Sequence, residues 1–202
     1  MIPRVFIITD RAVAPEPAPT LAPVLSVLPP GETAVVLREK DLPVREHLAL
    51  GRALRALTKS HGALLIIAGR LDLALACGAD GVHFGREAPS SEDARPLLPT
   101  SMLVGSSIHA GEPAPLLASY AFLSPIFPTS SKPLAAPLGL DGLRATAQRS
   151  RTPLVALGGI DESNAGRCLD SGASAVALRS RLLGADRLRA ARALAEIIAS
   201  RP

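Results

Sequence analysis

The sequence predicts a single α/β domain with the architecture of a (β/α)8 barrel. Residues 64–85 read as strand, helix and strand in quick succession, and a strand that returns after one helix implies a parallel crossover. The pattern recurs along the chain to give eight apolar strand candidates separated by mostly helical segments. No linker divides the 202 residues, which suit one barrel of modest size.

The first half of the chain supplies four of these units. Residues 63–67 form an apolar, β-branched run typical of a buried strand, residues 71–77 have helical spacing closed by Gly78, and residues 80–84 alternate as a strand. Before them, prolines predict that the helix near residues 21–28 is short or irregular. The remaining elements expected here are strands at 5–9 and 33–37 and helices at 44–60 and 91–98.

The second half continues the alternation. Strands are expected at 102–105, 121–124, 153–157 and 173–178, and helices at 112–119, 138–148, 162–171 and 186–200. Residues 125–137 are too rich in Pro and Ser for regular structure and form the longest predicted loop. A doubly wound sheet is the alternative architecture, but no GxGxxG turn follows the first strand.

Composition narrows the classes of function. Hydrophobic residues make up 48% of the chain and aromatic residues only 2%, so no aromatic and basic platform for nucleic acid is expected. The net charge of +4 is spread over helices and is compatible with anionic small molecules as partners. Cys77 and Cys168 lack metal or redox spacing and are interpreted as reduced core residues. No signal peptide or membrane span is recognised, which predicts a cytoplasmic protein without membrane partners.

Chemistry in such barrels collects on the loops that follow the strands. After the seventh strand, Gly158 and Gly159 allow close backbone approach to a ligand, and the following helix offers N–H groups to an anion. With Ser180 after the eighth strand, they predict a phosphate site. Paired glycines also occur in tight turns without a ligand, but their position favours phosphate.

Basic residues follow other strands. Arg38 and Lys40 point the same way if the chain stays extended, so they are candidates for binding a second anionic group. Lys132 in the long loop can join them, and Thr129 and Ser131 add hydroxyl donors. Solvated charge is the simpler interpretation of any one of these residues, and three cations on this face weaken it.

His109 is the candidate for proton transfer, because it follows the fifth strand at the predicted barrel mouth, two residues after Ser107. Taken alone, a solvated or structural histidine is the more common case. His47, His61 and His83 lie in or beside predicted helices and strands and receive no role. No residues have the spacing of a metal site or of a Ser-His-Asp triad.

Nearly the whole chain resembles the thiamine phosphate synthase and TenI family. The resemblance is carried by eight motifs in order: FIITDR at 6–11, VLREKDL at 36–42, RLDLALACGADGVHFGRE at 70–87, SIH at 107–109, SPIFPTSSK at 124–132, GLDGL at 139–143, VALGGIDESNA at 155–165 and SGASAVALRS at 171–180. The family fold is a (β/α)8 barrel, in agreement with the strand count.

The resemblance also implies chemistry. The family's synthases join a pyrimidine pyrophosphate to a thiazole phosphate and use magnesium to stabilise the departing pyrophosphate. By position, Arg38 and Lys40 match the pyrophosphate side, and Gly159 and Ser180 match the thiazole phosphate end. Further ligand-binding positions are matched by Ser107, Thr129, Ser131 and Lys132.

Three departures bear on the reaction. Synthases usually have Gln at the position of Val36, an Asn-Asp pair at Ala68 and Gly69, and Asp at Ala88. Two of those acids are the magnesium ligands, and neither Ala nor Gly has a side-chain oxygen. No protein-bound cofactor is therefore expected, and magnesium enters only if the chain is a synthase.

The sequence thus favours a TenI-like, metal-independent protein that binds a phosphorylated heterocycle of the thiazole phosphate type. In this hypothesis it is a thiazole tautomerase with His109 as acid and base. The alternatives are a thiamine phosphate synthase with a rebuilt metal site and a catalytically inactive metabolite-binding paralogue that acts through a partner. The sequence fixes neither the oligomeric state, with a homo-oligomer among the options, nor the roles of Arg179 and Arg181, nor whether the 125–137 loop closes over a ligand.

Overall fold

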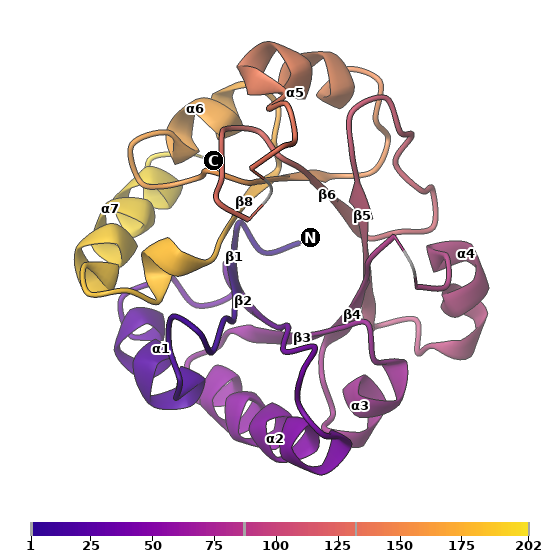
Figure 1. Ribbon diagram of the computed structural model, residues 1–202, viewed down its shortest axis with the longest axis vertical. Coiled ribbons are helices and arrows are strands. Elements are labelled where there is room, and N and C mark those ends of the chain that lie inside the picture. Colours follow the sequence, from indigo (N-terminus) through magenta and orange to yellow (C-terminus); the bar gives the residue numbers. More distant parts are fainter. Residues whose placement is uncertain (1, 87, 132, 202) are drawn as a thin grey trace.

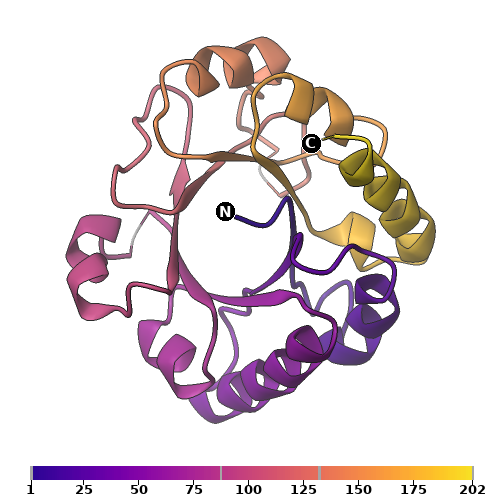
Figure 2. The ribbon, with the colours of Figure 1, turned by 180° about the vertical axis from the view of Figure 1, so that it is seen from behind.

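A computed structural model describes residues 2–86, 88–131 and 133–201. Eight parallel strands close into a barrel in chain order, with the helices outside it, so the predicted (β/α)8 architecture is confirmed (Figures 1 and 2). The strands are β1 (Val5–Ile8), β2 (Thr33–Leu37), β3 (Leu64–Ala68), β4 (Gly81–Phe84), β5 (Leu103–Ile108), β6 (Tyr120–Leu123), β7 (Leu154–Leu157) and β8 (Ala175–Leu178).

The helices follow the strands as an outer ring. They are α1 (Pro17–Leu25), α2 (Val44–Ser60), α3 (Leu71–Ala76), α4 (Ser91–Ala94) with a 3-10 turn η1 (Arg95–Leu97), α5 (Gly139–Ala147), α6 (Ala165–Asp170), a 3-10 turn η2 (Ser180–Leu182) and α7 (Arg187–Ala199). As the prolines predict, α1 is short, with Pro17 in its first turn and Pro23 inside it.

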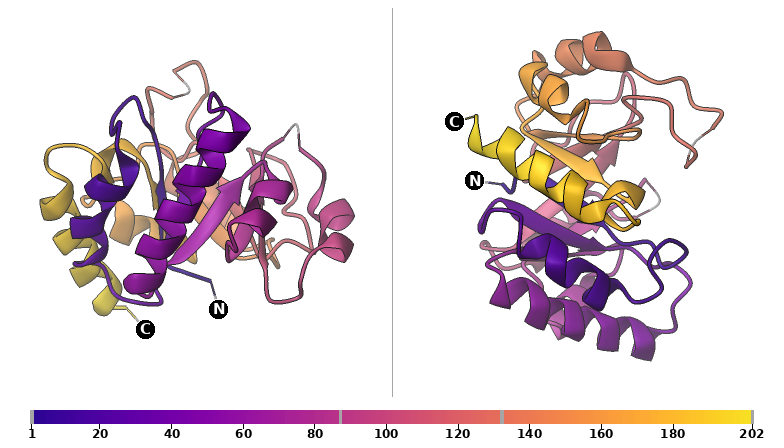
Figure 3. Two further views of the ribbon diagram at one scale, coloured as in Figure 1. Left: turned by 90° about the horizontal axis from the view of Figure 1, so that it is seen from below. Right: turned by 90° about the vertical axis from the view of Figure 1, so that its left-hand side faces the viewer.

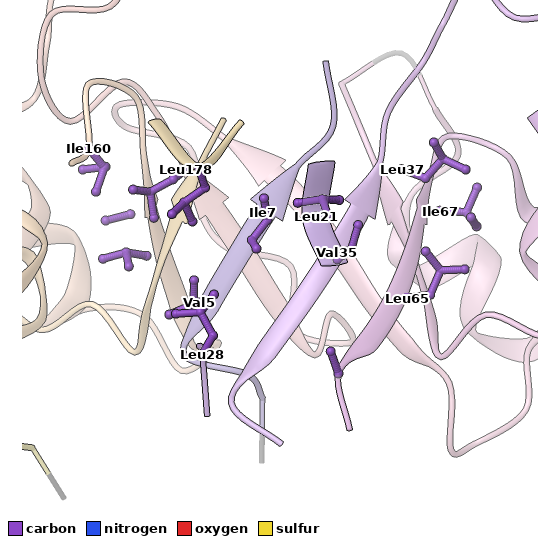
Figure 4. Close-up of a cluster of buried hydrophobic side chains, with 14 of the residues drawn as sticks. Val5, Ile7, Leu21, Leu28, Val35, Leu37, Leu65, Ile67, Ile160 and Leu178 are labelled. Atoms are coloured by element: carbon purple, nitrogen blue, oxygen red, sulfur yellow. The ribbon is translucent and has the colours of Figure 1, made fainter. Parts of the chain in front are cut away.

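Alternation along each strand divides the core in two. Val5 and Ile7 face the helices, whereas Phe6 and Ile8 face the barrel interior. The outer layer is visible in Figure 4, where Leu21 of α1 lies against the strands near Ile7 and Val35. Each fully buried aliphatic side chain in this layer contributes about 1.5–3 kcal/mol to folding.

The barrel interior holds most of the chain's few aromatic rings. Phe6 and Tyr120 have ring centroids 4.8 Å apart, and Phe6 meets Phe122 edge to face at 5.4 Å. Gly105 makes room for them, because a Cβ at that position would lie 2.2 Å from the Tyr120 ring. The Tyr120 ring on β6 therefore fits only because position 105 on β5 is glycine.

The segment between β5 and β6 differs from the prediction. The helix expected at 112–119 is absent, because Pro113 and Pro115 lack N–H donors and disfavour helical geometry in the residues before them. The strand before it is longer than expected and reaches Ile108. Ser107 therefore lies within β5, and His109 follows the strand directly rather than four residues later.

The loops that follow the strands gather at one end of the barrel. In the left view of Figure 3 the described parts of the 125–137 loop rise at this end, and the N-terminus lies at the opposite end. Among the described residues, no helix has the length and apolar character needed to cross a bilayer. The cellular location remains a prediction.

Candidate functional site

A cavity of about 910 Å³ opens at this end of the barrel, and all eight strands or the loops after them contribute to its wall. Nine of the ten predicted site residues line it: Arg38, Lys40, Ser107, His109, Thr129, Ser131, Gly158, Gly159 and Ser180. The tenth, Lys132, lies outside the described residues. The structure thus brings together residues spread over more than 140 positions of sequence, and their ligand-binding roles remain predictions.

The cavity floor is mostly apolar. Inward-facing residues near the ends of five strands form it: Ile8, Val36, Ala68, Phe122 and Ala177. Leu157 of β7 completes this surface. A floor of this kind suits a flat heterocycle, since apolar and aromatic groups bind ring faces while a few polar groups fix orientation.

His83, for which no role was predicted, supplies a polar group on the floor. Its Nε2 lies 2.8 Å from Ser107 Oγ, and its ring packs on Phe122 at a centroid distance of 4.2 Å. Burial, and next the charge of Arg38, lowers the pKa of His83 to about 3. His83 is therefore neutral near pH 7, and its side chain shares a hydrogen bond with a predicted ligand-binding hydroxyl.

The direction of the His83 side chain is the signal that could have identified it as a cavity residue. In a barrel strand, Val82 and Phe84 pack outward against helices, so the residue between them must face inward at the ligand end. His47 was also given no role, yet it is buried at the cavity wall. Burial is the main cause that lowers the pKa of His47, so it too favours the neutral form.

The glycine turn after β7 is built around positive φ angles. Gly158 has φ 95° and Gly159 has φ 66°, and a Cβ on Gly159 would lie 2.5 Å from the Pro128 carbonyl oxygen. Asn164 braces this turn, because its Nδ2 donates to Gly159 O at 2.9 Å and its Oδ1 accepts from Asp161 N at 3.0 Å. The positive φ angles and the close contact with Pro128 are sufficient reasons for glycine in this turn, even if no ligand binds there.

The turn can nevertheless receive an anion. Among the described residues, no hydrogen bond uses the backbone N–H groups of Gly159 and Ser180, and both residues line the cavity. The expected helix donors are not adjacent, because α6 begins only at Ala165. The donors available to a phosphate therefore come from the turn and from the start of η2.

Arg181 forms ion pairs with carboxylates at this end of the cavity. Its Nε donates to Glu162 Oε2 at 2.6 Å, and Nη1 lies 3.6 Å from Asp186. The hydrogen bonds from Arg181 are the first cause that lowers the pKa of Glu162 to about 2. Arg181 thus joins the β7 and β8 loops, and much of its charge is neutralised by protein carboxylates.

Cations of a different kind follow β2. Arg38, Glu39 and Lys40 are exposed, buried and exposed in turn, which agrees with the prediction that the two basic residues point the same way. Among the described residues neither Arg38 nor Lys40 has an ion-pair partner. Their positive charge remains available to an anion in the cavity.

The long loop after β6 contacts the same cavity. Thr129 and Ser131 form a local turn in which Ser131 N donates to Thr129 Oγ1 at 3.4 Å. Arg179 donates through Nη2 to Ser131 Oγ at 2.7 Å, and its Nη1 pairs with Asp10 at 3.2 Å. Arg179 therefore connects the loops that follow β1, β6 and β8.

His109 meets a carboxylate. Glu112 Oε2 accepts from His109 N at 2.9 Å and lies 3.3 Å from His109 Nδ1, and Arg86 pairs with the other oxygen of Glu112 at 2.6 Å. The hydrogen bond from His109 N is the main cause that lowers the pKa of Glu112. A carboxylate on Nδ1 is the arrangement that orients an imidazole for acid and base chemistry.

The positions that hold magnesium in the resembled synthases do not fit a metal here. Ala68, Gly69 and Ala88 line the cavity but offer no side-chain oxygen. Within the described part of the chain, no group of three or more His, Cys, Asp or Glu side chains is placed to hold a metal ion. Glu39 is the one carboxylate among the described lining residues.

Fold and site together define a (β/α)8 barrel with a cavity at the carboxyl ends of its strands, lined by basic side chains and by the glycine turn after β7. The family model for thiamine monophosphate synthase matches residues 5–182, so the chain belongs to this family of thiamine biosynthesis.

Relatives and a solved structure support the assignment. The chain is 43% identical over 202 residues to a putative thiamine-phosphate synthase of Geobacter sulfurreducens, covering 97% of this chain and 94% of the relative. It is 42% identical over 186 residues to the thiamine-phosphate synthase of Moorella thermoacetica, with 89% of each chain covered. The solved thiamine phosphate pyrophosphorylase from Pyrococcus furiosus superposes with a TM-score of 0.83 at 32% identity, covering 98% of this chain and 96% of that one.

Proposed function

We propose that this protein is a transferase that joins a pyrimidine pyrophosphate to a thiazole phosphate. The sequence alone favours the tautomerase, whereas the names of relatives at 42–43% identity favour the synthase alternative. The observation that supports the proposal is that two separate groups of potential anion-binding residues line one cavity: Arg38 with Lys40 after β2, and the Gly159 and Ser180 N–H donors after β7 and β8. A reaction between two phosphorylated substrates needs both.

The geometry keeps the two regions apart. In the closed barrel, β1 lies between β2 and β8, and it is followed by Asp10, whose carboxylate is paired with Arg179. An anion that binds at Arg38 is thus separated from one at Ser180 by the end of β1. The faces of the two heterocycles can pack against the apolar floor between these regions instead of contacting water.

The residues then have distinct tasks. As the pyrimidine methylene carbon transfers to the thiazole nitrogen, the carbon–oxygen bond to pyrophosphate breaks and both bonding electrons leave with the pyrophosphate. Arg38 and Lys40 stabilise that growing negative charge by charge-assisted hydrogen bonds. The nitrogen lone pair forms the new carbon–nitrogen bond. Because the described residues do not provide the family's magnesium ligands, no step is assigned to a metal.

The tautomerase is kept as a second candidate because of the contact between His109 and Glu112. That pair provides an oriented imidazole at the cavity wall, as a proton transfer on a thiazole ring requires. This reaction would use the phosphate turn for the phosphate of its substrate and a cation such as Arg38 for the carboxylate, so it needs no site for a second phosphorylated ligand.

The test is a product assay with purified protein and both phosphorylated substrates, with and without chelator. We expect thiamine phosphate to form, and Arg38→Met to lower kcat/KM for the pyrimidine substrate by ~10-fold or more through loss of one charge-assisted contact. Arg45→Met, an exposed arginine on α2 outside the cavity, serves as the matched control.

Two results would count against the transferase. Absence of product, together with aromatisation of a thiazole phosphate carboxylate by wild type but not by His109→Ala, would establish the second candidate instead. Absence of both reactions alongside retained phosphate binding would favour the non-catalytic binding protein.

A further inference from the structure

Arg179 is a cation at the end of the cavity where we place the phosphate, and the proposed reaction assigns it no role. It precedes Ser180 directly, and its side chain is 32% exposed and lines the cavity. Its guanidinium contacts Ser131, which is 48 residues away in sequence, at 2.7 Å and Asp10 at 3.2 Å. The side chain is therefore held in place and still accessible from the cavity.

The described contacts leave Arg179 with unused hydrogen-bonding capacity. A guanidinium has five N–H donors; the hydrogen bond to Ser131 uses one on Nη2, and Asp10 is an ion-pair partner beside Nη1. A phosphate on the N–H groups of Gly159 and Ser180 would lie beside the residue that carries this guanidinium. Arg179 can then bind the phosphate without releasing either partner. Arg181 is less suited, because its guanidinium is paired with Glu162 and Asp186.

We propose that Arg179 binds the phosphate of the thiazole-type substrate and, through the same guanidinium, fastens the 129–131 segment of the β6–α5 loop. Phosphate binding and the position of the loop are then coupled. A thiazole alcohol without phosphate would lack the contact with Arg179 and would also fail to stabilise the loop. The identity of the ligand as a thiazole phosphate rests on the proposed function. The contact with a phosphate group and the coupling to the loop do not.

The first test uses inorganic phosphate as the probe and needs no turnover. Calorimetric titration should show that Arg179→Met binds phosphate ~10-fold or more weakly than wild type, because one charge-assisted contact is lost. Arg149→Met, an exposed arginine beyond α5 that does not line the cavity, should bind as wild type does.

The second test follows the loop. Leu134 is 99% exposed, so chymotrypsin cleavage after it reports loop mobility. We expect phosphate to slow this cleavage in wild type and Arg149→Met but not in Arg179→Met or Ser131→Ala. Ser131→Ala keeps the cation, so its phosphate affinity should fall less than that of Arg179→Met.

The double variant completes the design. If one guanidinium serves both tasks, the effects of Arg179→Met and Ser131→Ala on cleavage should not add, because the second change removes nothing further. Phosphate affinity of Arg179→Met within ~2-fold of wild type, or full protection of the loop in Ser131→Ala, would overturn the proposal. Failure of the condensation reaction with these results intact would overturn the proposed function alone.

Discussion

His83 shows how one side chain acquires its properties from its place in the barrel. It is buried between Phe122 and Tyr120, and its Nε2 contacts Ser107 Oγ at 2.8 Å. Its Nδ1 is buried without a hydrogen-bond partner among the described residues. A charged imidazole there would lose most of its hydration, so the neutral ring is strongly preferred.

This preference can be measured. Because the pKa of His83 is lowered to about 3, we expect its ring resonances in NMR spectra to stay constant between roughly pH 5 and pH 8. The resonance is assigned by its loss in His83→Gln. A titration of His83 with a midpoint near the ordinary histidine value of about 6.5 would contradict the burial argument.

The turn after β7 is the element to which we assign phosphate binding. Gly159 combines φ 66° with a Cβ position 2.5 Å from the Pro128 carbonyl oxygen, so Gly159→Ala meets both strain and a clash with backbone. We expect a loss of about 2–4 kcal/mol in the free energy of unfolding, measured by denaturant titration.

Gly111 provides the matched comparison. Its φ is 80°, and nothing lies within 4 Å of the position where a Cβ would be. Gly111→Ala should therefore cost only about 1 kcal/mol, from strain alone. Equal losses in the two variants would show that the packing of the turn against the β6–α5 loop is not what requires glycine at Gly159.

The ion pair between Arg181 and Glu162 predicts a pH dependence of stability. The pKa of Glu162 falls from 4.5 to about 2 on folding, so the stabilisation is complete above the unfolded value and is lost as the pH falls toward 2. Since the side chains are 30% and 18% exposed, we expect about 1–2 kcal/mol at pH 7.

Stability curves of wild type and Glu162→Gln check this expectation. The difference between them should be present at pH 7, shrink below about pH 4.5 and vanish near pH 2. Glu196→Gln, on an exposed position of α7 without an ion pair among the described residues, should leave the curve unchanged. A difference that persists at low pH would show that Glu162 stabilises by packing rather than by charge.

At the scale of the molecule, the sequence predicted the barrel because each strand is a short apolar run between glycine, proline or polar residues. The periodicity of apolar residues and the positions of glycine and proline are local properties of the sequence, and they predicted the locations of all eight strands. The prediction of a helix at 112–119 was wrong because Pro113 and Pro115 prevent helical geometry there.

The site was predicted less completely, for two physical reasons. Residues that follow strands, such as Arg38 and Ser180, were found because topology alone places them at the ligand end. His83 was missed because its direction depends on which strand face is internal. The contact from Arg179 to Asp10 and Ser131 depends on barrel closure, which joins β8 to β1 and brings together loops distant in sequence.

We propose that one cavity holds two phosphorylated ligands at separate ends, and simultaneous binding of two anions is the decisive measurement. We would titrate inorganic pyrophosphate by calorimetry into the protein alone and into protein saturated with thiazole phosphate. We predict that one pyrophosphate binds per chain in both cases, that its affinity changes by less than ~10-fold, and that Arg38→Met binds it more weakly. Displacement of thiazole phosphate by pyrophosphate would contradict it, because a single shared anion site would then explain all the cations of the cavity.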